Sequence, residues 1–445
     1  MDERSTRPTV SRILDDGTLI ELLYDPAPKT TAFAVQPPTG DAYIAADYDL
    51  PDGERLVHYS PDNNLIATDC VLLPSALGVF TAKPSLLAEV RAFIGRYLDL
   101  PDEFAEVGAH YVLLTWVYDA FQELPYLRFQ GEFGTGKTRA LLTVGSLCYK
   151  PFFAAGASTV SPIFHVLEAF AGTLVLDEAD FRFSDATADL TKILNNGTVS
   201  GFPVLRTMTN RRRELNPQAF RVFGPKIVGM RQGFADRALE SRFITERMTS
   251  QLSASATPIH LPAEFHAEAR ELRNKLLAWR FAARATTRPH PERLVVGLGP
   301  RASQTVLSLV SLMDDPGLSQ AVCLRVGLAD ERLREEIAPL VERAVLEATI
   351  GAFERGGSAG APIGMITNFF NEDAPALIGR TVSPKWVGTF VRTAFGLQPV
   401  KAHGVYAIPH AERPRVDALA ARFAKVEDGI AQDAKSTVSE FEPEA

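Results

Sequence analysis

The sequence predicts an α/β fold built on a parallel sheet, and two observations support this fold class. Apolar runs with the length of buried strands alternate with helical segments, and they are Leu127–Gln130, Thr173–Leu176 and Lys226–Met230. Strands buried on both faces are typical of parallel sheets that carry helices on each side. The first run leads into a glycine-rich segment at residues 131–138 and then into a predicted helix at Arg139–Leu147.

The length of 445 residues suggests about two to four folded units. Hydrophobic residues make up 46% and charged residues 22%, which excludes a disordered, collagen-like or wholly coiled-coil chain. The cysteines Cys70, Cys148 and Cys323 lie far apart, so neither a zinc ribbon nor a disulfide framework is indicated. Residues 1–7 lack the apolar core of a signal peptide, and the longest apolar stretch, Tyr111–Phe121, is shorter than a membrane helix. We therefore expect a cytoplasmic protein without a membrane partner.

The region before the α/β core predicts a β-rich N-terminal domain at residues 1–84. Clusters of Pro, Gly, Asp and Asn separate short runs of β-forming residues, as they do in hairpins. These runs are Thr18–Tyr24, Thr31–Gln36, Arg55–Tyr59 and Cys70–Leu73. Apolar residues at helical spacing then predict a helical linker at residues 85–124.

The core at residues 125–250 is followed by three further regions. Helical patterns dominate residues 251–355. A small separate module occupies residues 356–411, where Ser383 and Pro384 have the pattern of an N-cap followed by a first helical residue. The tail, residues 412–445, is expected to be helical at first and then acidic and disordered.

The segment at residues 131–138 matches the complete phosphate-loop (P-loop) pattern, in which glycines let successive backbone amides point at phosphate oxygens. The predicted contacts come from Gly131, Gly134, Thr135, Gly136, Lys137 and Thr138. Lys137 is expected to reach the β- and γ-phosphates, and the hydroxyl of Thr138 to complete the shell of a Mg²⁺ ion. The pattern therefore predicts ATP and Mg²⁺ as ligands, and the alternative is a glycine-rich turn that binds nothing.

A second motif, at residues 173–180, ends a buried strand in carboxylates. The strand ends of such sheets line the nucleotide crevice. Asp177 would bind Mg²⁺ directly or through water, and Glu178 would orient and polarise the water that attacks the γ-phosphate. Asp180 would assist the metal site or cap the next helix. An Asp-Glu pair can also be an ordinary solvated loop, but its position after an apolar run, downstream of Lys137, favours the catalytic interpretation.

The segment at residues 239–243, Leu-Glu-Ser-Arg-Phe, resembles the arginine-finger segment of AAA+ ATPases, in particular the MCM-like and related helicases of plasmids, phages and integrated mobile elements. The resemblance implies that Arg242 acts as a finger on the ATP of a neighbouring subunit, with Arg237 as the alternate. Gly297–Ala302 is similar to the start of the lid helix of MCM-type proteins, which implies that Arg301 contacts the γ-phosphate. The alternatives are a surface salt-bridge arginine for Arg242 and a plain first-turn arginine for Arg301.

The resemblance covers residues 104–315 and makes residues 125–250 an AAA+ core and residues 251–355 its helical lid. It implies a homo-oligomer, in the form of a hexameric ring. The family usually has Asn or Thr after the third apolar strand, at the position called the first sensor. In this sequence the strand is followed by Arg231 and Gln232, so this position departs from the family. Gln232 would have to substitute for that residue.

The stretch Leu194–Gly197, after the second motif, resembles one that recurs in a helicase-like domain family of mobile elements. Its side chains Asn195 and Asn196 could equally be structural turn residues.

Positive charge is concentrated in one segment of an otherwise acidic chain. The net charge is −8, yet residues 201–250 hold ten Arg or Lys and four Asp or Glu, a net of +6. Within this segment, Phe202–Leu215 predicts a β-hairpin whose tip carries Arg211, Arg212 and Arg213. Helicases of the MCM and superfamily-three types carry such a hairpin in the ring channel, so the resemblance implies that these arginines and Arg206 grip single-stranded DNA. A solvated face or a site for an acidic neighbour is the alternative.

The module at residues 356–411 resembles the winged helix that ends MCM-type helicases. Its recognition helix would be Pro384–Phe395, and its DNA contacts would come from Lys385, Arg392 and, on the wing, Lys401. Winged helices bind duplex DNA in the major groove, but many dock proteins instead, and both alternatives are open here.

Together these features predict a Mg²⁺-ATP-dependent AAA+ motor that hydrolyses ATP by direct attack of water, assembles as a ring and translocates on or unwinds DNA. Its catalytic residues would be Lys137, Glu178, Arg242 and Arg301. One alternative is an ATP-gated DNA-binding regulator, such as a transposition or defence ATPase that does not unwind DNA. Another is a protein remodeller that uses no DNA.

Overall fold

The computed structural model divides the chain into two compact units, each with its own hydrophobic core. The first unit consists of Met1–Gly233 and Ser241–Leu328, and the second of Phe234–Glu240 and Ala329–Ala445. The residues that the structure describes are 5–155, 159–177, 185–209, 215–234, 236–249, 257–356, 360–378, 380–402 and 404–421.

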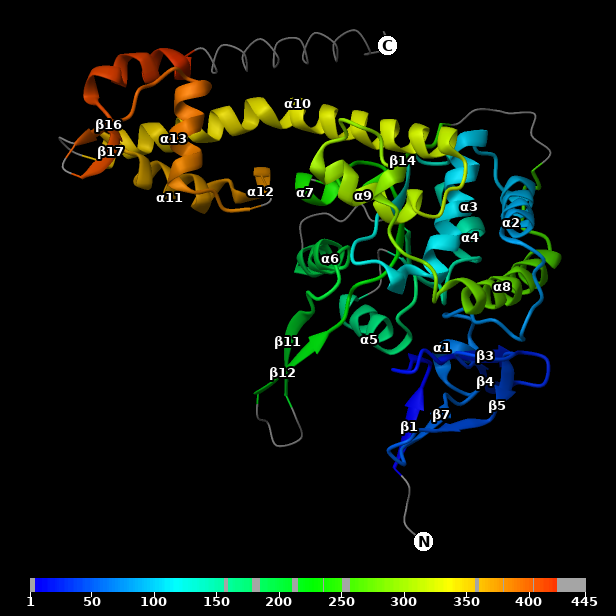
Figure 1. Ribbon diagram of the computed structural model, residues 1–445. Coiled ribbons are helices and arrows are strands. Elements are labelled where there is room, and N and C mark those ends of the chain that lie inside the picture. The colour runs from blue at the N-terminus through cyan, green and yellow to red at the C-terminus, as the bar shows by residue number, and fades with distance from the viewer. Residues whose placement is uncertain are drawn as a thin grey trace, which may run out of the picture. The chain divides into compact units, whose positions relative to one another are not determined.

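The first unit is built around a parallel sheet, as the sequence predicts (Figure 1). Within the described residues this central sheet has five strands, in the order β14-β8-β13-β10-β9. The strands are β8 (Tyr126–Gln130), β9 (Phe152–Ala155), β10 (Leu174–Asp177), β13 (Lys226–Met230) and β14 (Phe243–Arg247). Each neighbouring pair is parallel, so the carboxyl ends of these strands lie at one edge of the sheet.

Two strands of the central sheet, β9 and β14, are missing from the sequence prediction. They lie at the two edges of the sheet, where only one side of a strand has a neighbour. β9 has four residues, and β14 mixes polar with apolar residues. β14 therefore lacks the nearly unbroken apolar run that marks the inner strands. β9 is apolar throughout, Phe-Phe-Ala-Ala, but two of its residues are alanines, which have a low propensity for strands.

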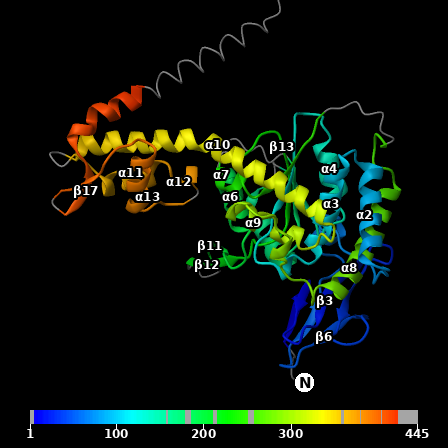
Figure 2. The same ribbon diagram turned by 45° about the horizontal axis from the view of Figure 1, so that its top comes forward.

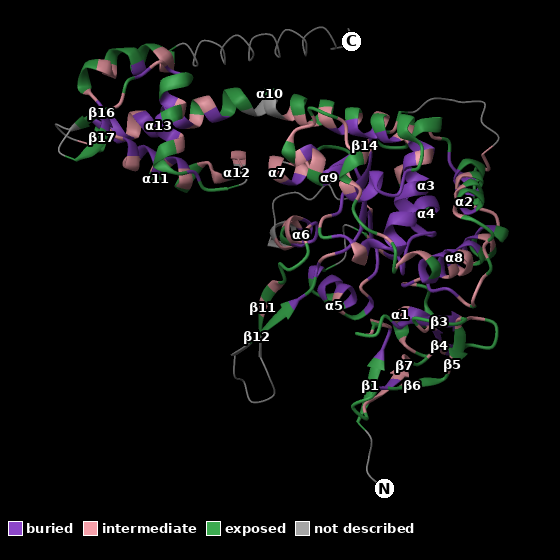
Figure 3. Ribbon diagram, in the orientation of Figure 1, coloured by how far each residue is buried: buried purple, intermediate pink, exposed green. Residues whose placement is uncertain are grey.

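The helices of the first unit include α3 (Asp102–Trp116), which is buried along nearly its whole length (Figure 3). A helix that is apolar on all sides belongs to a core, so part of the predicted linker region lies inside the unit. The other helices are α1 (Asn64–Ala67), α2 (Lys83–Tyr97), α4 (Lys137–Gly145), α5 (Val160–Phe170), α6 (Asp185–Asn196), α8 (Glu264–Ala283) and α9 (Pro300–Val310), with the 3₁₀ turns η1 (Tyr118–Ala120) and η2 (Pro291–Arg293).

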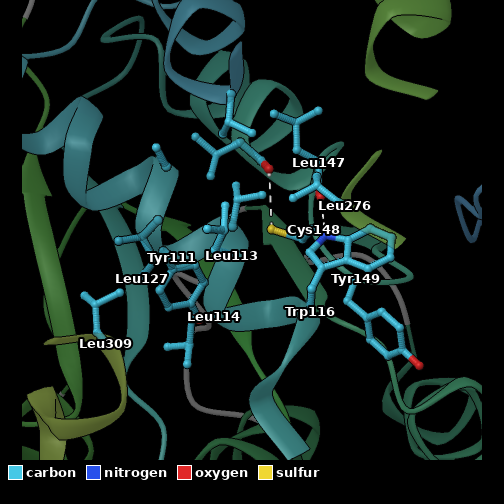
Figure 4. Close-up of a cluster of buried hydrophobic side chains, with 14 of the residues drawn as sticks. Tyr111, Leu113, Leu114, Trp116, Leu127, Leu147, Cys148, Tyr149, Leu276 and Leu309 are labelled. Carbon is cyan, nitrogen blue, oxygen red and sulfur yellow. Dashed lines mark hydrogen bonds between the residues drawn. The ribbon is translucent and has the colours of Figure 1, made fainter. Parts of the chain in front are cut away.

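The hydrophobic core joins α3 to the end of α4 (Figure 4). The indole nitrogen of Trp116 donates a hydrogen bond to the carbonyl oxygen of Leu147 at 2.9 Å. The thiol of Cys148 donates to the carbonyl oxygen of Val144 at 3.4 Å, and burial raises the pKa of this thiol. Close packing of this kind fixes α4, and with it the phosphate loop that precedes the helix.

Short strands form two sheets in the N-terminal part of the first unit, in the orders β2-β3-β4-β5 and β1-β7-β6. They are β1 (Thr6–Thr9), β2 (Ser11–Ile13), β3 (Leu19–Asp25), β4 (Thr30–Gln36), β5 (Tyr43–Ala45), β6 (Asp47–Asp49) and β7 (Arg55–His58). The prediction of a strand at Cys70–Leu73 is wrong. Val71 makes an isolated bridge to Phe152 instead, because this segment runs beside the start of β9. That residues 1–84 form a separate domain stays a prediction.

A buried ion cluster connects β3 to the rest of the first unit. The carboxylate of Glu21 lies 2.7 Å from the ammonium of Lys150 and 2.8 Å from the guanidinium of Arg280, and these side chains are at most 2% exposed. Arg280 also pairs with Asp119 at 2.8 Å. Removing one partner of such a pair leaves a buried charge uncompensated, which costs about 3–5 kcal/mol. The cluster therefore attaches β3 firmly to the core.

The predicted hairpin segment forms an antiparallel pair of strands, β11 (Val204–Thr209) and β12 (Leu215–Phe220). Figures 1 and 2 show that this pair extends away from the central sheet. The predicted tip arginines lie outside the described residues, and they are Arg211, Arg212 and Arg213.

The second unit contains the C-terminal part of the long helix α10 (Pro316–Arg355). Its other elements are α7 (Arg237–Glu240), β15 (Ala361–Pro362), α11 (Ile363–Asp373), α12 (Pro375–Ile378), α13 (Pro384–Thr393), β16 (Val400–Ala402), β17 (Val405–Ile408) and η4 (His410–Glu412). The hydroxyl of Ser383 accepts a hydrogen bond from the backbone nitrogen of Trp386 at 3.3 Å, which confirms the predicted N-cap of α13. That this unit is a winged helix stays a prediction. None of the helices in the described ranges is long and apolar enough to cross a membrane.

Candidate nucleotide-binding site

The phosphate loop connects the carboxyl end of β8 to the first residue of α4, as its sequence pattern predicts. Gly134 and Gly136 have φ angles of 78° and 90°, in the left-handed region that favours glycine. Gly131 is restricted for a different reason, since a Cβ there would collide with the carbonyl oxygen of Met248. The glycine spacing thus allows both the curl of the loop and its close approach to the end of β14.

Lys137 lies inside the curl of the phosphate loop. Its ammonium group donates hydrogen bonds to the carbonyl oxygens of Gly131 and Glu132, each at 2.7 Å. The side chain is only partly buried. A phosphate oxygen could therefore replace either carbonyl as the acceptor without the lysine leaving the loop.

Thr138 and Asp177 meet at the carboxyl edge of the central sheet, although they are far apart in sequence. The hydroxyl of Thr138 donates a hydrogen bond to a carboxylate oxygen of Asp177 at 2.7 Å. A hydroxyl and a carboxylate are oxygen ligands, the type that Mg²⁺ binds together with water and phosphate oxygens. The donor set therefore fits the predicted Mg²⁺ site.

Gly229 has no role in the sequence analysis beyond its place in the apolar run Lys226–Met230. It lies on β13, between the strand of the phosphate loop and the strand of Asp177. A Cβ at this position would lie 2.8 Å from Cδ1 of Leu141 and 3.1 Å from Oδ1 of Asp177. The missing side chain lets the carboxylate and α4 approach each other across β13, and no sequence motif marks this requirement.

A cavity of about 630 Å³ adjoins the phosphate loop. Thr135, Gly136 and Arg139 line it from the loop and the first turn of α4. Its other walls come from residues 97–101, 246–249 and 257–259. These segments carry no motif, so the sequence gives no signal that they meet beside the loop.

Arg242 and Arg301, the predicted finger and lid arginines, lie together, but not beside the phosphate loop. The backbone nitrogen of Tyr126, the first residue of β8, donates to the carbonyl oxygen of Arg242 at 2.9 Å. Arg242 is therefore at the amino end of a strand whose carboxyl end carries the loop. The two ends of this five-residue strand are four steps of roughly 3.3 Å apart, which is about 13 Å.

The side chains of both arginines contact neighbouring residues of the same chain. The guanidinium of Arg242 donates to the hydroxyl of Thr198 at 2.9 Å and to the carbonyl oxygen of Asn195. Arg301 donates from Nε to the hydroxyl of Ser241 at 3.1 Å. Asn195 and Asn196 are thus the last residues of α6 and not turn residues, and the sequence did not predict the contact of Asn195 with Arg242.

Lys226 is a second lysine surrounded by backbone carbonyls. It begins β13 and is fully buried. Its ammonium donates to the carbonyl oxygens of Val222 at 2.8 Å and Gly224 at 3.0 Å. Burial, with a smaller contribution from the charge of Arg242, lowers the pKa of Lys226 to about 7.

The predicted DNA contacts are found in different environments. The guanidinium of Arg206 lies 4.6 Å from the ring centre of Phe164 and 3.5 Å from the carboxylate of Asp189. Lys385, Arg392 and Lys401, in the second unit, are exposed. The remaining predicted residues lie outside the described residues, and these are Glu178, Asp180, Arg211, Arg212 and Arg213.

Comparison with known proteins gives matches only among solved structures, since no protein-family model and no curated protein matches the chain. The C-terminal region of NrS-1 shares 12% identity over 87% of this chain and 95% of its own, with a TM-score of 0.34. The SCCmec type IV Cch helicase shares 11% over 93% of this chain and 80% of its own, with a TM-score of 0.36. A full-length MCM homologue from Methanopyrus kandleri shares 11% over 67% and 68%, with a TM-score of 0.31. Because all three TM-scores are below 0.5, these likenesses carry no argument about function, which depends on the residues of the site.

Proposed function

We propose that the protein is an ATPase that binds Mg²⁺-ATP at the phosphate loop. The observation that carries this proposal is the convergence of Lys137, Thr138 and Asp177 at the carboxyl edge of the central sheet. Ligands of open α/β sheets bind at this edge, beyond the carboxyl ends of the strands. The left-handed glycines and the amino end of α4 give the loop the backbone shape and the partial positive charge that favour phosphate.

Each polar group of the site has a distinct role in this proposal. Lys137 exchanges its carbonyl acceptors for phosphate oxygens and holds them as a point charge. Thr138 and Asp177 hold Mg²⁺, which when bound neutralises charge on the phosphates. Glu178, the residue after Asp177, would orient the attacking water. The cavity beside the loop would take the nucleoside part of ATP, because it begins at Thr135 and Gly136.

We further propose that the arginines act on the ATP of a neighbouring copy of the chain. About 13 Å of strand separates Arg242 from its own phosphate loop, farther than an arginine side chain reaches. Arg301, which contacts Ser241 next to Arg242, would act from the same side. The site then requires a second copy, which supports a homo-oligomeric ring, and six copies is the number that the family resemblance implies.

The proposed motor would act on single-stranded DNA in the channel of the ring. Support comes from the hairpin β11–β12, which extends from the central sheet, and from the local charge of +6 in a chain of net −8. Arg206 lies between Phe164 and Asp189 of its own chain. The tip arginines Arg211, Arg212 and Arg213 would therefore provide most of the contact with DNA. Lys385, Arg392 and Lys401 would contact duplex DNA if the second unit is a winged helix.

The decisive experiment measures ATP hydrolysis with and without single-stranded DNA. Wild-type protein should hydrolyse ATP faster when DNA is added, and replacing the three tip arginines by alanine should abolish the stimulation. A charge-matched control replaces three arginines outside the hairpin by alanine, and these are Arg7, Arg12 and Arg91. This control should keep the stimulation of ATP hydrolysis by DNA. ATPase activity without DNA stimulation would favour a protein remodeller. Stimulation without unwinding of a forked duplex would favour an ATP-gated DNA-binding regulator.

A further inference from the structure

Arg139, the residue directly after Thr138, connects α4 to two other segments of the first unit. One terminal nitrogen of its guanidinium donates to the carbonyl oxygens of Tyr97 at 3.3 Å and Pro258 at 3.0 Å. The other donates to the carbonyl oxygen of Ile259 at 2.6 Å. The planar fork of arginine, with five N–H donors, suits such a set of acceptors better than the single ammonium of lysine.

These acceptors belong to two separate segments that line the cavity beside the phosphate loop. Tyr97 is the last residue of α2, and residues 97–101 form one wall. Pro258 and Ile259 belong to the segment before α8, which forms another wall. Arg139 itself lines the cavity, together with Thr135 and Gly136. A single side chain thus sets the positions of two walls relative to the phosphate loop.

The helices behind these walls are joined by other contacts. The hydroxyl of Tyr97 donates to the carboxylate of Glu268 on α8 at 3.0 Å. The rings of Tyr97 and Phe265 pack edge to face, with their centres 5.0 Å apart. Because these contacts do not involve Arg139, loss of its guanidinium should leave α2 and α8 packed together. The loss should shift the backbone segments at the mouth of the cavity.

We propose that Arg139 is a positioning residue that sets the width of the cavity for the nucleoside part of the nucleotide. This role depends on the proposed function, because it assumes that the phosphate loop binds a nucleoside triphosphate. Arg139 contacts cavity walls and not the loop atoms that hold phosphate. It should therefore control the affinity for the nucleoside and leave the affinity for the phosphate chain unchanged.

The test compares two probes, ATP and inorganic triphosphate, each titrated with Mg²⁺ in a calorimeter. For Arg139→Met, the Kd of ATP should rise at least about tenfold, a 1.4 kcal/mol effect that the loss of more than one hydrogen bond can produce. The Kd of inorganic triphosphate should stay the same. Arg139→Lys, which keeps the charge and one donor group, should lie between Arg139→Met and wild type. In steady-state hydrolysis, KM should rise while kcat is kept.

Two control variants define the limits of the test. Lys137→Ala should bind neither ATP nor inorganic triphosphate, because it removes the contact with the phosphates. Arg96→Met removes a neighbouring arginine of α2 that pairs with Glu268 at 2.6 Å and does not line the cavity, so both affinities should stay at the wild-type value. The thermal midpoint of each variant shows that it is folded.

Three outcomes would overturn the role of Arg139. The first is an unchanged Kd for ATP in Arg139→Met. The second is an equal loss of affinity for ATP and for inorganic triphosphate, which would indicate damage to α4 itself. The third is a fall in kcat at unchanged KM. If the folded wild-type protein binds neither probe, the proposed function fails first, and this result is distinct from the other three.

Discussion

The two ends of the central sheet each hold a lysine among backbone carbonyls, but the lysines differ in burial. At the carboxyl end, Lys137 donates to the carbonyl oxygens of Gly131 and Glu132 and is only partly buried. At the amino end, Lys226 donates to those of Val222 and Gly224 and is fully buried, so its pKa falls to about 7. The two ammonium groups thus make the same kind of hydrogen bond, one partly exposed to solvent and the other fully buried.

This difference indicates which lysine can exchange its partners. A partly buried ammonium at the start of α4 can take phosphate oxygens in place of carbonyls at little cost. A buried ammonium would have to lose its acceptors in an apolar environment, which costs several kcal/mol. Lys137 is therefore suited to bind a ligand, whereas Lys226 stabilises the turn before β13.

Lys137→Ala should reduce ATP binding at least about 100-fold, which corresponds to 2.7 kcal/mol, because the phosphates lose their only lysine contact within the described loop. The matched variant Lys226→Met should keep the Kd of wild type, since its ammonium lies at the other end of the sheet. Titration with a fluorescent ATP analogue in magnesium buffer measures both. Equal Kd values for ATP in the two variants would contradict the proposed difference between Lys137 and Lys226.

Arg242→Ala should lower kcat by about three orders of magnitude or more, the range known for arginine fingers, and leave the Kd of ATP unchanged. The reason is that Arg242 lies at the end of β8 opposite to its own phosphate loop. Arg237→Ala, at the alternate finger position, should have a smaller effect. ATP hydrolysis at saturating ATP measures both.

Mixing experiments test whether Arg242 acts between subunits. Arg242→Ala and Glu178→Gln subunits, each inactive alone, should recover partial activity together, because mixed interfaces can combine an intact finger with an intact catalytic carboxylate. Absence of recovery over the whole range of mixing ratios would speak against action between subunits.

The stability of the protein should rise with pH between about 7 and 10.4 through Lys226. Its pKa is about 7 in the folded state and near 10.4 in an unfolded chain. Within this window the unfolded state binds more protons, so the free energy of unfolding rises by at most about 1.4 kcal/mol per pH unit. Lys226→Met should lower the slope by the contribution of Lys226, which denaturant titrations at pH 7.5, 8.5 and 9.5 would show.

Lys150 also contributes to the pH dependence of stability, because burial lowers its pKa to about 8. Its contribution has the same sign but begins about one pH unit higher. The difference between wild type and Lys226→Met therefore isolates Lys226. An identical slope in the two proteins would mean that Lys226 is charged when folded.

Gly229→Ala should have the smallest effect. The Mg²⁺ concentration needed for half-maximal ATP binding should rise roughly threefold, which corresponds to less than 1 kcal/mol. The new Cβ would lie 3.1 Å from Oδ1 of Asp177 and 2.8 Å from a methyl group of Leu141, and a leucine side chain can shift. Titration of Mg²⁺ at fixed ATP measures it. Gly364→Ala, where nothing lies within 4 Å of the new Cβ, is the control and should change nothing.

The local parts of the site could be predicted from the sequence, because each depends on residues that are close together in the chain. The loop requires glycines at set positions, and Asp177 follows the apolar run of β10. The inner strands β8, β10 and β13 were also predicted, since they are buried on both faces. The edge strands β9 and β14 were not, because β14 mixes polar with apolar residues and half of β9 is alanine, which has a low propensity for strands.

Cys70–Leu73 shows why local patterns fail for other segments. Its residues form strands readily, but Val71 pairs with Phe152 of the central region rather than with the N-terminal sheets. The choice of partner depends on a contact across about 80 positions of the chain, and propensity says nothing about such a contact.

The order of residues along the chain determined where phosphate should bind, since the amides, the lysine and the hydroxyl of residues 131–138 come from one continuous turn. Only the folded chain decided what surrounds that turn. Packing brought Tyr97 and Ile259 to Arg139, placed Gly229 between Leu141 and Asp177, and put Arg242 at the far end of β8. The physical reason is that glycine conformation and helix starts are local properties, whereas burial and strand neighbours depend on distant segments packing together.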